Sequence, residues 1–188
     1  MRYSPGHKQE TRRRLLEGGR AIAKKGGFES TGVDTLMASI GLTGGAFYNH
    51  FPSKAALFKE LIERELENSA QMLAGDENSP SDHVAKRLRS YLSTAHALNP
   101  ETGCAIPTLG AEIARAPAEV RRLVEQELKR IEKSWSERLQ DSADGWAVMA
   151  QCVGAIVLAR VVESEATRKD ILKSSRHFID KQRVKAGS

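Results

Sequence analysis

The sequence has little cysteine and no long apolar run, and both absences narrow the class of protein. Two cysteines, Cys104 and Cys152, in 188 residues are too few for a disulfide framework, so we expect free thiols. No apolar run approaches the roughly eighteen residues that a membrane-spanning helix needs. No secretory-type apolar stretch follows the basic N-terminus. We therefore expect a cytoplasmic protein.

Catalytic and metal-binding signatures are missing as well. The sequence contains no recognisable nucleophile–base arrangement, phosphate-binding loop, HExxH-type site or paired-cysteine metal site. We therefore expect no enzymatic activity, no catalytic residue, no metal site and no cofactor. A protein that works by binding is the better interpretation.

The excess positive charge lies in the first third of the chain. Residues 1–60 hold ten Lys or Arg against five Asp or Glu, whereas the remaining residues hold 19 of each. Such a distribution favours a polyanionic partner that contacts the first third, either nucleic acid or a membrane surface. The alternative is a solvated basic helix without a partner.

Helical periodicity dominates the rest of the pattern, and no strand alternation lasts long enough to count. We expect an all-α protein of about nine helices, with breaks at residues 75–82 and 99–103, where turn-forming residues gather. Pro107 is expected to kink a short helix. The helix at 144–162 is apolar nearly all round, so it must be buried on most faces. It either lies at the centre of a monomer or pairs, with the helix at 167–183, against a second copy of the chain.

The amino-terminal third predicts a helix-turn-helix between residues 33 and 51. Gly41 lies in the turn, where a positive φ is often needed. We expect Ser30 or Thr31 to cap the second helix, Thr43 to cap the third, and Ser53 to cap a long fourth helix. One face of the unit is expected to pack inward through Leu36, Ile40, Leu42, Phe47 and Phe51.

The opposite face of the third helix is poor in side chains. Gly44 and Gly45 weaken a helix, and such a broken local rule is typical of a functional surface that needs close approach. Tyr48 and His50 can donate hydrogen bonds to phosphate oxygens, while Asn49 can read a base edge. Structurally, the glycines are equally consistent with simple loop residues.

A second clue comes from the first position of the fourth helix. Lys54 there opposes the helix dipole, but the amides, the dipole and the lysine would together favour a phosphate. Thr31 offers a similar hydroxyl near the second helix. The basic residues Lys8 and 12–14 can extend the contact along a DNA backbone.

The segment TGVDTLMASIGLTGGAFYNHFPSKAALF, residues 31–58, resembles the DNA-binding signature of the TetR family of transcriptional regulators, above all in GLT-G-AFY-HF-SK--L. Ile40 departs from the usual small residue, and Gly44 from a longer polar one. The resemblance implies a DNA-binding domain at 1–54 and a helical effector-binding and dimerisation domain at 55–188. It also implies a homodimeric repressor that leaves a pseudo-palindromic operator in double-stranded DNA when a small molecule binds.

Carried over by position, the resemblance names the residues that meet DNA. The phosphate contacts would be Thr31, Tyr48, His50 and Lys54. The base-facing positions would be Thr43, Gly44, Gly45 and Asn49.

The region from 81 to 140 must supply any effector pocket, because a pocket between helices is the usual site. Cys104 near a helix N-terminus is a candidate for a lowered thiol pKa and hence for a thiol-reactive effector, although a packed apolar role is the simpler interpretation. The candidate effector-binding residues are Tyr91, His96, Cys104, Thr108, Glu112 and Trp135.

One alternative stays open at this stage. A non-enzymatic helical module could use the same basic end on a membrane or on a protein partner. The dependence of DNA binding on salt and on base sequence separates the two hypotheses.

Overall fold

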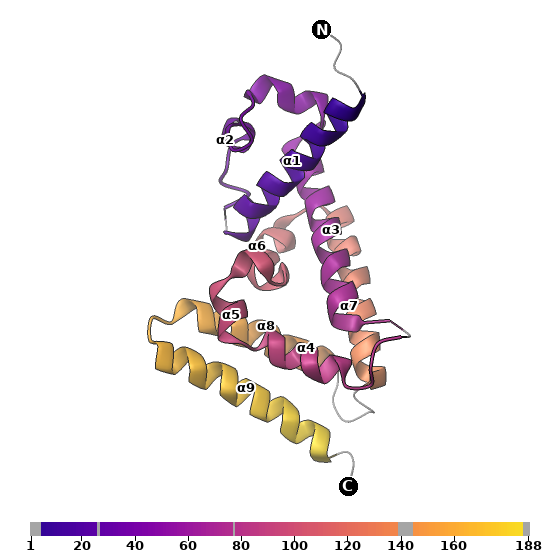
Figure 1. Cartoon of the computed structure of the whole chain (residues 1–188), viewed down its shortest axis with the longest axis vertical. Coiled ribbons are helices and arrows are strands. Elements are labelled where there is room, and N and C mark those ends of the chain that lie inside the picture. Colours follow the sequence, from indigo (N-terminus) through magenta and orange to yellow (C-terminus); the bar gives the residue numbers. More distant parts are fainter. Residues whose placement is uncertain (1–4, 26, 77, 139–144, 186–188) are drawn as a thin grey trace.

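The computed structural model describes residues 5–25, 27–76, 78–138 and 145–185, and in these ranges the chain forms helices and no strands. The expected all-α class is confirmed. Figure 1 shows an amino-terminal unit at one end, a long helix α3 that leads away from it, and a layer of crossing helices at the other end. No helix of the described residues is long and apolar enough to cross a membrane.

One long helix and two short elements build the amino-terminal unit: α1 (Pro5–Lys24), α2 (Val33–Ala38) and the 3-10 helix η1 (Gly44–Asn49). Gly41 takes a φ of 73° in the turn between α2 and η1, as the sequence predicts. The third helix is a 3-10 helix because two of its six residues are glycines, which give little support to α-helical geometry.

One expected helix cap is wrong, and a second is confirmed in position only. Gly32 stands at the N-cap of α2, and the hydroxyl of Thr31 donates instead to the carbonyl of Gly27. Thr43 stands at the N-cap of η1, but its side chain accepts no capping hydrogen bond. The cap of α3 (Lys54–Ala74) is confirmed, since Ser53 Oγ accepts from the backbone N–H of Ala56 at 3.1 Å.

The unusual Ile40 is accommodated by a glycine on the helix opposite. A Cβ built on Gly18 of α1 would lie 3.0 Å from Cγ2 of Ile40. The missing side chain at position 18 therefore makes room for the extra methyl groups at position 40. This pairing lets α1 and the end of α2 lie close together, with Ile40 buried between them.

The body begins where α3 leaves the amino-terminal unit. α3 packs along α7 (Ala118–Arg138), and the two run together towards the crossing layer (Figure 1). α6 (Ile106–Arg115) lies between that layer and the amino-terminal unit. Pro107 falls in the first turn of α6, where a missing N–H costs nothing, so the expected kink is wrong.

The crossing layer is built from three helices: α4 (His83–Tyr91), α8 (Gly145–Val161) and α9 (Glu165–Lys185). The expected helix that begins near residue 81 ends earlier than its periodicity suggests. Ser93 caps a separate short helix, α5 (Thr94–Leu98). The 3-10 turn η2 (Pro100–Thr102) follows directly.

Two hydrophobic cores hold these elements together. The first joins α1, α2, η1 and the first half of α3 to residues of α6 and the start of α7. The second lies in the body, around Trp135 and the inner face of α8. The division at residues 54 and 55 stays a prediction, and it falls at the first residue of α3.

Candidate nucleic-acid interface

The 3-10 helix η1 carries four of the eight residues that the sequence assigns to DNA. Phe47 is fully buried, and its ring meets the ring of Tyr48 edge-on at 5.3 Å between centroids. Phe51 packs on the other side of Phe47 at 6.0 Å. This aromatic anchor holds Tyr48 outward, with 66% of the residue exposed, and Asn49 beside it is also exposed.

The two glycines of η1 have different surroundings, although the sequence interpretation gives them one role. A Cβ on Gly44 would overlap the carboxylate oxygen Oδ1 of Asp34 on α2, so a side chain at position 44 would force that exposed carboxylate to turn away. A Cβ on Gly45 would meet nothing within 4 Å. Only Gly45 therefore provides an open, bare surface that another molecule can approach.

His50 lies at the edge of this surface and is half-buried. Its Nδ1 is buried without a hydrogen-bond partner among the described residues. Burial first, and then the positive charges of Lys8 and Arg12, lower the pKa of His50 below its ordinary value. The ring is therefore mainly neutral at neutral pH, with one N–H to donate.

Lys54 is half-buried and is held against the amino-terminal unit. Its Nζ donates to the carbonyl of Glu29 at 2.7 Å and lies 5.2 Å from the ring centroid of Phe28. The carboxylate of Glu29 is bound instead by Arg115 of α6, at 2.7 Å. The ammonium of Lys54 thus has no carboxylate partner among the described residues, and two of its N–H groups stay available for a phosphate.

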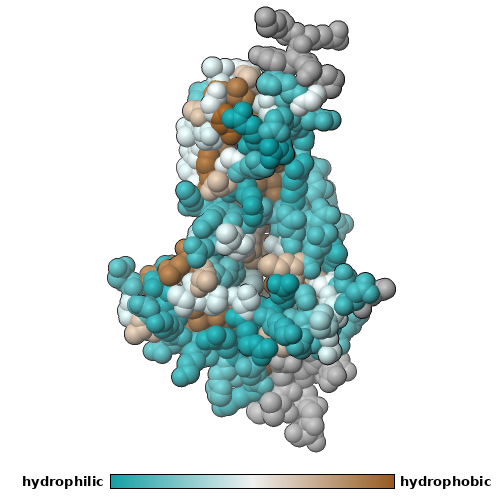
Figure 2. Space-filling view, viewed as in Figure 1, coloured by the Kyte–Doolittle hydropathy of each residue, from teal (hydrophilic) through white to brown (hydrophobic). Residues whose placement is uncertain are grey.

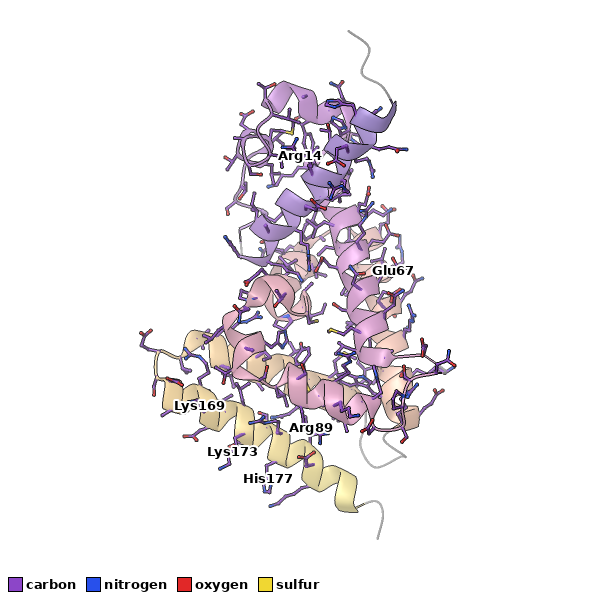
Figure 3. All side chains as sticks on the ribbon, viewed as in Figure 1. Arg14, Glu67, Arg89, Lys169, Lys173 and His177 are labelled. Carbon is purple, nitrogen blue, oxygen red and sulfur yellow. The ribbon has the colours of Figure 1, made fainter. Side chains whose placement is uncertain are left out.

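The three consecutive arginines of α1, at positions 12–14, are engaged within the protein, which the sequence interpretation missed. Arg12 forms an ion pair with Glu60 of α3 and lies over the ring of Phe51, 4.5 Å from its centroid. Arg13 pairs with neighbouring glutamates on its own helix. Arg14, labelled in Figure 3, donates to the carbonyl of Ile40. These contacts stabilise the unit, so the three arginines are less available to a DNA backbone than the exposed residues of η1 are.

The candidate effector residues do not form one group in the structure. Tyr91, Cys104 and Trp135 line a closed, mainly apolar cavity of about 20 Å³ in the second core. Trp135 is fully buried and donates from Nε1 to the carbonyl of Leu73 at 3.1 Å. The cavity has room for about one water, so a larger occupant would require the helices to move apart.

The other three candidates lie outside that cavity. His96 lines an open cleft on the surface of the body, beside Tyr91. The hydroxyl of Thr108 accepts a hydrogen bond from Arg160 at 2.7 Å. Glu112 lines a separate cleft between α3, α6 and the loop after α1. Their assignment to an effector stays a prediction.

The expected lowering of the Cys104 pKa is wrong. Burial raises the pKa of this thiol, and a hydrogen bond from the backbone of Ile106 at the start of α6 does not offset it. Burial also raises the pKa of Cys152, to about 12. Both thiols are therefore protonated at neutral pH and are poor nucleophiles.

The structure also reveals a buried ion pair that no sequence motif indicated. Lys24, at the end of α1, is 2% exposed and contacts the carboxylate of Glu65 on α3. Arg20 binds the same carboxylate at 2.5 Å. Neither spacing nor periodicity relates residues 24 and 65, because the pairing depends on how α1 crosses α3.

Comparison with known proteins finds a family match over the segment that contains η1. A family model described as "Bacterial regulatory proteins, tetR family" matches residues 15–61, which cover the second half of α1, all of α2 and η1, and the start of α3. The transcriptional repressor DhaR of Mycobacterium sp. strain GP1 is 25% identical over 129 residues, 69% of this chain and 63% of DhaR. The repressor KstR of Rhodococcus jostii RHA1 is 29% identical over 90 residues, 48% of this chain and 41% of KstR. The matches thus span less than two thirds of these relatives.

Solved structures support the fold of the whole chain. A TetR regulator from Legionella pneumophila has a TM-score of 0.73 at 18% identity, covering 96% of this chain and 98% of that one. NemR of E. coli, in its reduced form, has a TM-score of 0.71 at 19% identity, covering 92% and 96%. The helix-turn-helix with its outward Tyr48, the matched family segment and the shared all-helical architecture lead to one conclusion: the chain belongs to the TetR family of bacterial regulatory proteins.

Proposed function

We propose that the protein is a homodimeric transcriptional repressor that binds a pseudo-palindromic operator and is released by a small molecule. The observation that carries the DNA-binding part is the surface of η1, where Gly45, Tyr48 and Asn49 lie exposed above a buried aromatic anchor. The surplus of positive charge in residues 1–60 supports a polyanionic partner for this surface.

Selection of bound duplexes from a random DNA pool tests this proposal. A repressor of this kind selects one pseudo-palindrome far above bulk DNA, and its affinity falls steeply as salt rises, because several phosphates are neutralised. Binding without sequence preference, or binding to anionic vesicles instead, would support the alternative of a membrane or protein module.

The dimer is supported by the outer face of α8. Four large apolar residues of this helix are exposed, which is unusual for a monomer. Phe178 on the neighbouring α9 is also a large apolar residue that is exposed. Figure 2 shows hydrophobic residues in two places on this face, over part of the amino-terminal unit and near the ends of α5 and α8. The exposed α8 residues are Trp146, Val157, Leu158 and Val161.

Release by an effector is supported by the path of α3. This helix begins at Lys54, a proposed phosphate contact, and ends at the second core, where Leu73 lies next to Trp135. An occupant of the body that displaces α3 would change the spacing of the two reading units, which must match successive major grooves roughly 34–36 Å apart. The raised pKa of Cys104 favours a non-covalent effector over a thiol-reactive one.

Substitutions on η1 separate base reading from phosphate contact. Tyr48→Phe and Lys54→Ala are expected to weaken binding to every DNA sequence alike. Asn49→Ala should also reduce the preference for the operator, by about 1–3 kcal/mol at one base pair. Fluorescence anisotropy with the operator and with single-base variants measures both effects. Equal losses for all three variants would remove Asn49 from base reading.

The two glycines of η1 give a matched pair of variants. Gly45→Ala is expected to leave the free energy of unfolding unchanged or to raise it by about 0.5–1 kcal/mol, yet to weaken operator binding. Gly44→Ala is expected to lower the free energy of unfolding by at most about 1 kcal/mol, because the exposed Asp34 side chain has to turn away from the added Cβ. Urea unfolding and anisotropy measure the two properties. Full operator affinity in Gly45→Ala would show that no close approach occurs there.

A further inference from the structure

An open cleft of about 220 Å³ lies on the body, separate from the closed cavity around Trp135. Its walls come from the end of α3, from α4 and α5, and from the loop that precedes α6. In contrast to the closed cavity, it has room for a small molecule without any movement of the helices.

The side chains of the cleft favour a small organic anion. Arg87 is its only charged lining residue, and this guanidinium has no hydrogen-bond or ion-pair partner among the described residues. The hydroxyls of Ser90 and Thr102 line the same space, while Met72 and Leu73 give it an apolar wall. A carboxylate that binds Arg87 in two parallel hydrogen bonds, with an apolar remainder against that wall, fits this set.

The inner wall of the cleft is a tightly fixed histidine. His96 Nδ1–H donates to the carbonyl of Tyr91 at 2.7 Å, and Nε2 accepts the backbone N–H of Cys104 at 3.1 Å. These two bonds fix the neutral ring with its proton on Nδ1. The ring lies so close to Gly103 that a Cβ on this glycine would overlap it.

Gly103 in turn holds the end of α1. Its carbonyl accepts a hydrogen bond from Lys24 Nζ at 2.6 Å. Because Lys24 is buried with Glu65, loss of this carbonyl would leave part of a buried ammonium without a partner. A shift of Gly103 would therefore displace the end of α1, the helix that packs against the helix-turn-helix.

We propose that this cleft is the effector site, that it takes a small apolar carboxylate through Arg87, and that the occupant moves Gly103 away from Lys24. The inference rests on the proposed repressor function and names the site and ligand class for its release. An occupant that binds between His96 and Thr102 disturbs the close contact of His96 with Gly103. The freed end of α1 then lowers the affinity of the reading unit for the operator.

Gly103→Ala imitates the occupant without any ligand. Its φ of −91° is open to alanine, so the substitution acts through the overlap with His96 and not through backbone strain. We expect operator affinity to fall by a factor of roughly 5–150, the usual range of an allosteric coupling. The matched control is Gly110→Ala on α6, where a Cβ meets nothing within 4 Å, and it should bind as the wild type does.

The double variant His96→Ala with Gly103→Ala removes the overlap and should bind more tightly than Gly103→Ala alone. Wild-type affinity in a folded Gly103→Ala variant would overturn the proposed route. So would equal losses in Gly103→Ala and in the double variant. A wild-type protein that selects no operator would instead contradict the proposed function itself.

Benzoate and hexanoate are suitable probes of the ligand class, and they test the site even if Gly103→Ala fails to fold. Amide NMR shifts of the wild type are expected at Ser90, Thr102 and Gly103, and saturating probe should weaken operator binding. Arg87→Met should abolish the shifts. Arg89→Met is the matched control, because Arg89 lies on the same helix but lines a different hollow against α9 (Figure 3). Binding of neither probe, or equal binding to Arg87→Met, would overturn the assignment.

Discussion

Glu65→Leu is expected to lower the free energy of unfolding by about 3–5 kcal/mol, because it leaves the buried ammonium of Lys24 without its carboxylate. Lys24 is 2% exposed, so water cannot replace the lost partner, and the carbonyl of Gly103 alone carries no compensating charge. Urea unfolding followed by circular dichroism measures the effect.

Removal of the other partner should lower the free energy of unfolding by less than Glu65→Leu does. Lys24→Met leaves Glu65 paired with Arg20, whose side chain reaches the same carboxylate from the surface. We expect Lys24→Met to lower the free energy of unfolding by about 1–3 kcal/mol. The double variant Lys24→Met with Glu65→Leu should be more stable than Glu65→Leu alone, since no charge is then left buried. A double variant that is less stable than either single one would contradict this account.

Leu158→Glu is expected to convert the proposed dimer to a monomer and to weaken operator binding by a factor of roughly 10²–10⁴, because the second half-site would no longer contribute. Leu158 is 56% exposed on the outer face of α8, between Val157 and Val161. A carboxylate there would be desolvated opposite its own copy in a symmetric interface. Sedimentation velocity measures the mass, and anisotropy measures the affinity.

A matched control uses the same replacement on a polar face. Lys173 lies on α9 in line with Lys169 and His177, one helical turn apart in each step (Figure 3). Lys173→Glu should keep the dimer and most of the operator affinity. If Leu158→Glu also stays dimeric, the interface lies elsewhere on the chain.

The sequence predicts the elements of this protein well where the signal is local. The apolar stripe of α3 and its Ser53 cap are read directly from neighbouring residues, and both are confirmed. Phe47 and Phe51, four residues apart, are buried on one face as their spacing indicates. Gly41 with its positive φ is a third such case.

The predictions fail where the physical cause is distant in sequence. Gly44 and Gly45 are the same residue type in the sequence. Only the position of Asp34, ten residues before Gly44, gives the two glycines different surroundings. The N-terminus of α6 favours a reactive Cys104, but burial by other helices outweighs it. Glu112 has no local feature that would place it in a cleft beside α3 rather than in the central cavity. The contact of Lys24 with Glu65 likewise depends on a helix crossing that no spacing encodes.

The first hydrophobic core has a consequence for the engineering of hybrid regulators. Leu109 and Ile113 of α6, with Val120 and Val124 of α7, close the same core as Phe28 and Phe58 near the helix-turn-helix. A chimera joined within α3 would therefore bring a foreign α6 and α7 against the native reading head, with mismatched shapes at the seam. A chimera that takes α6 and α7 from the same parent as the amino-terminal unit keeps the native contacts of this core. Swapping of specificities between relatives is thus expected to succeed only when the exchanged segments are discontinuous in the gene.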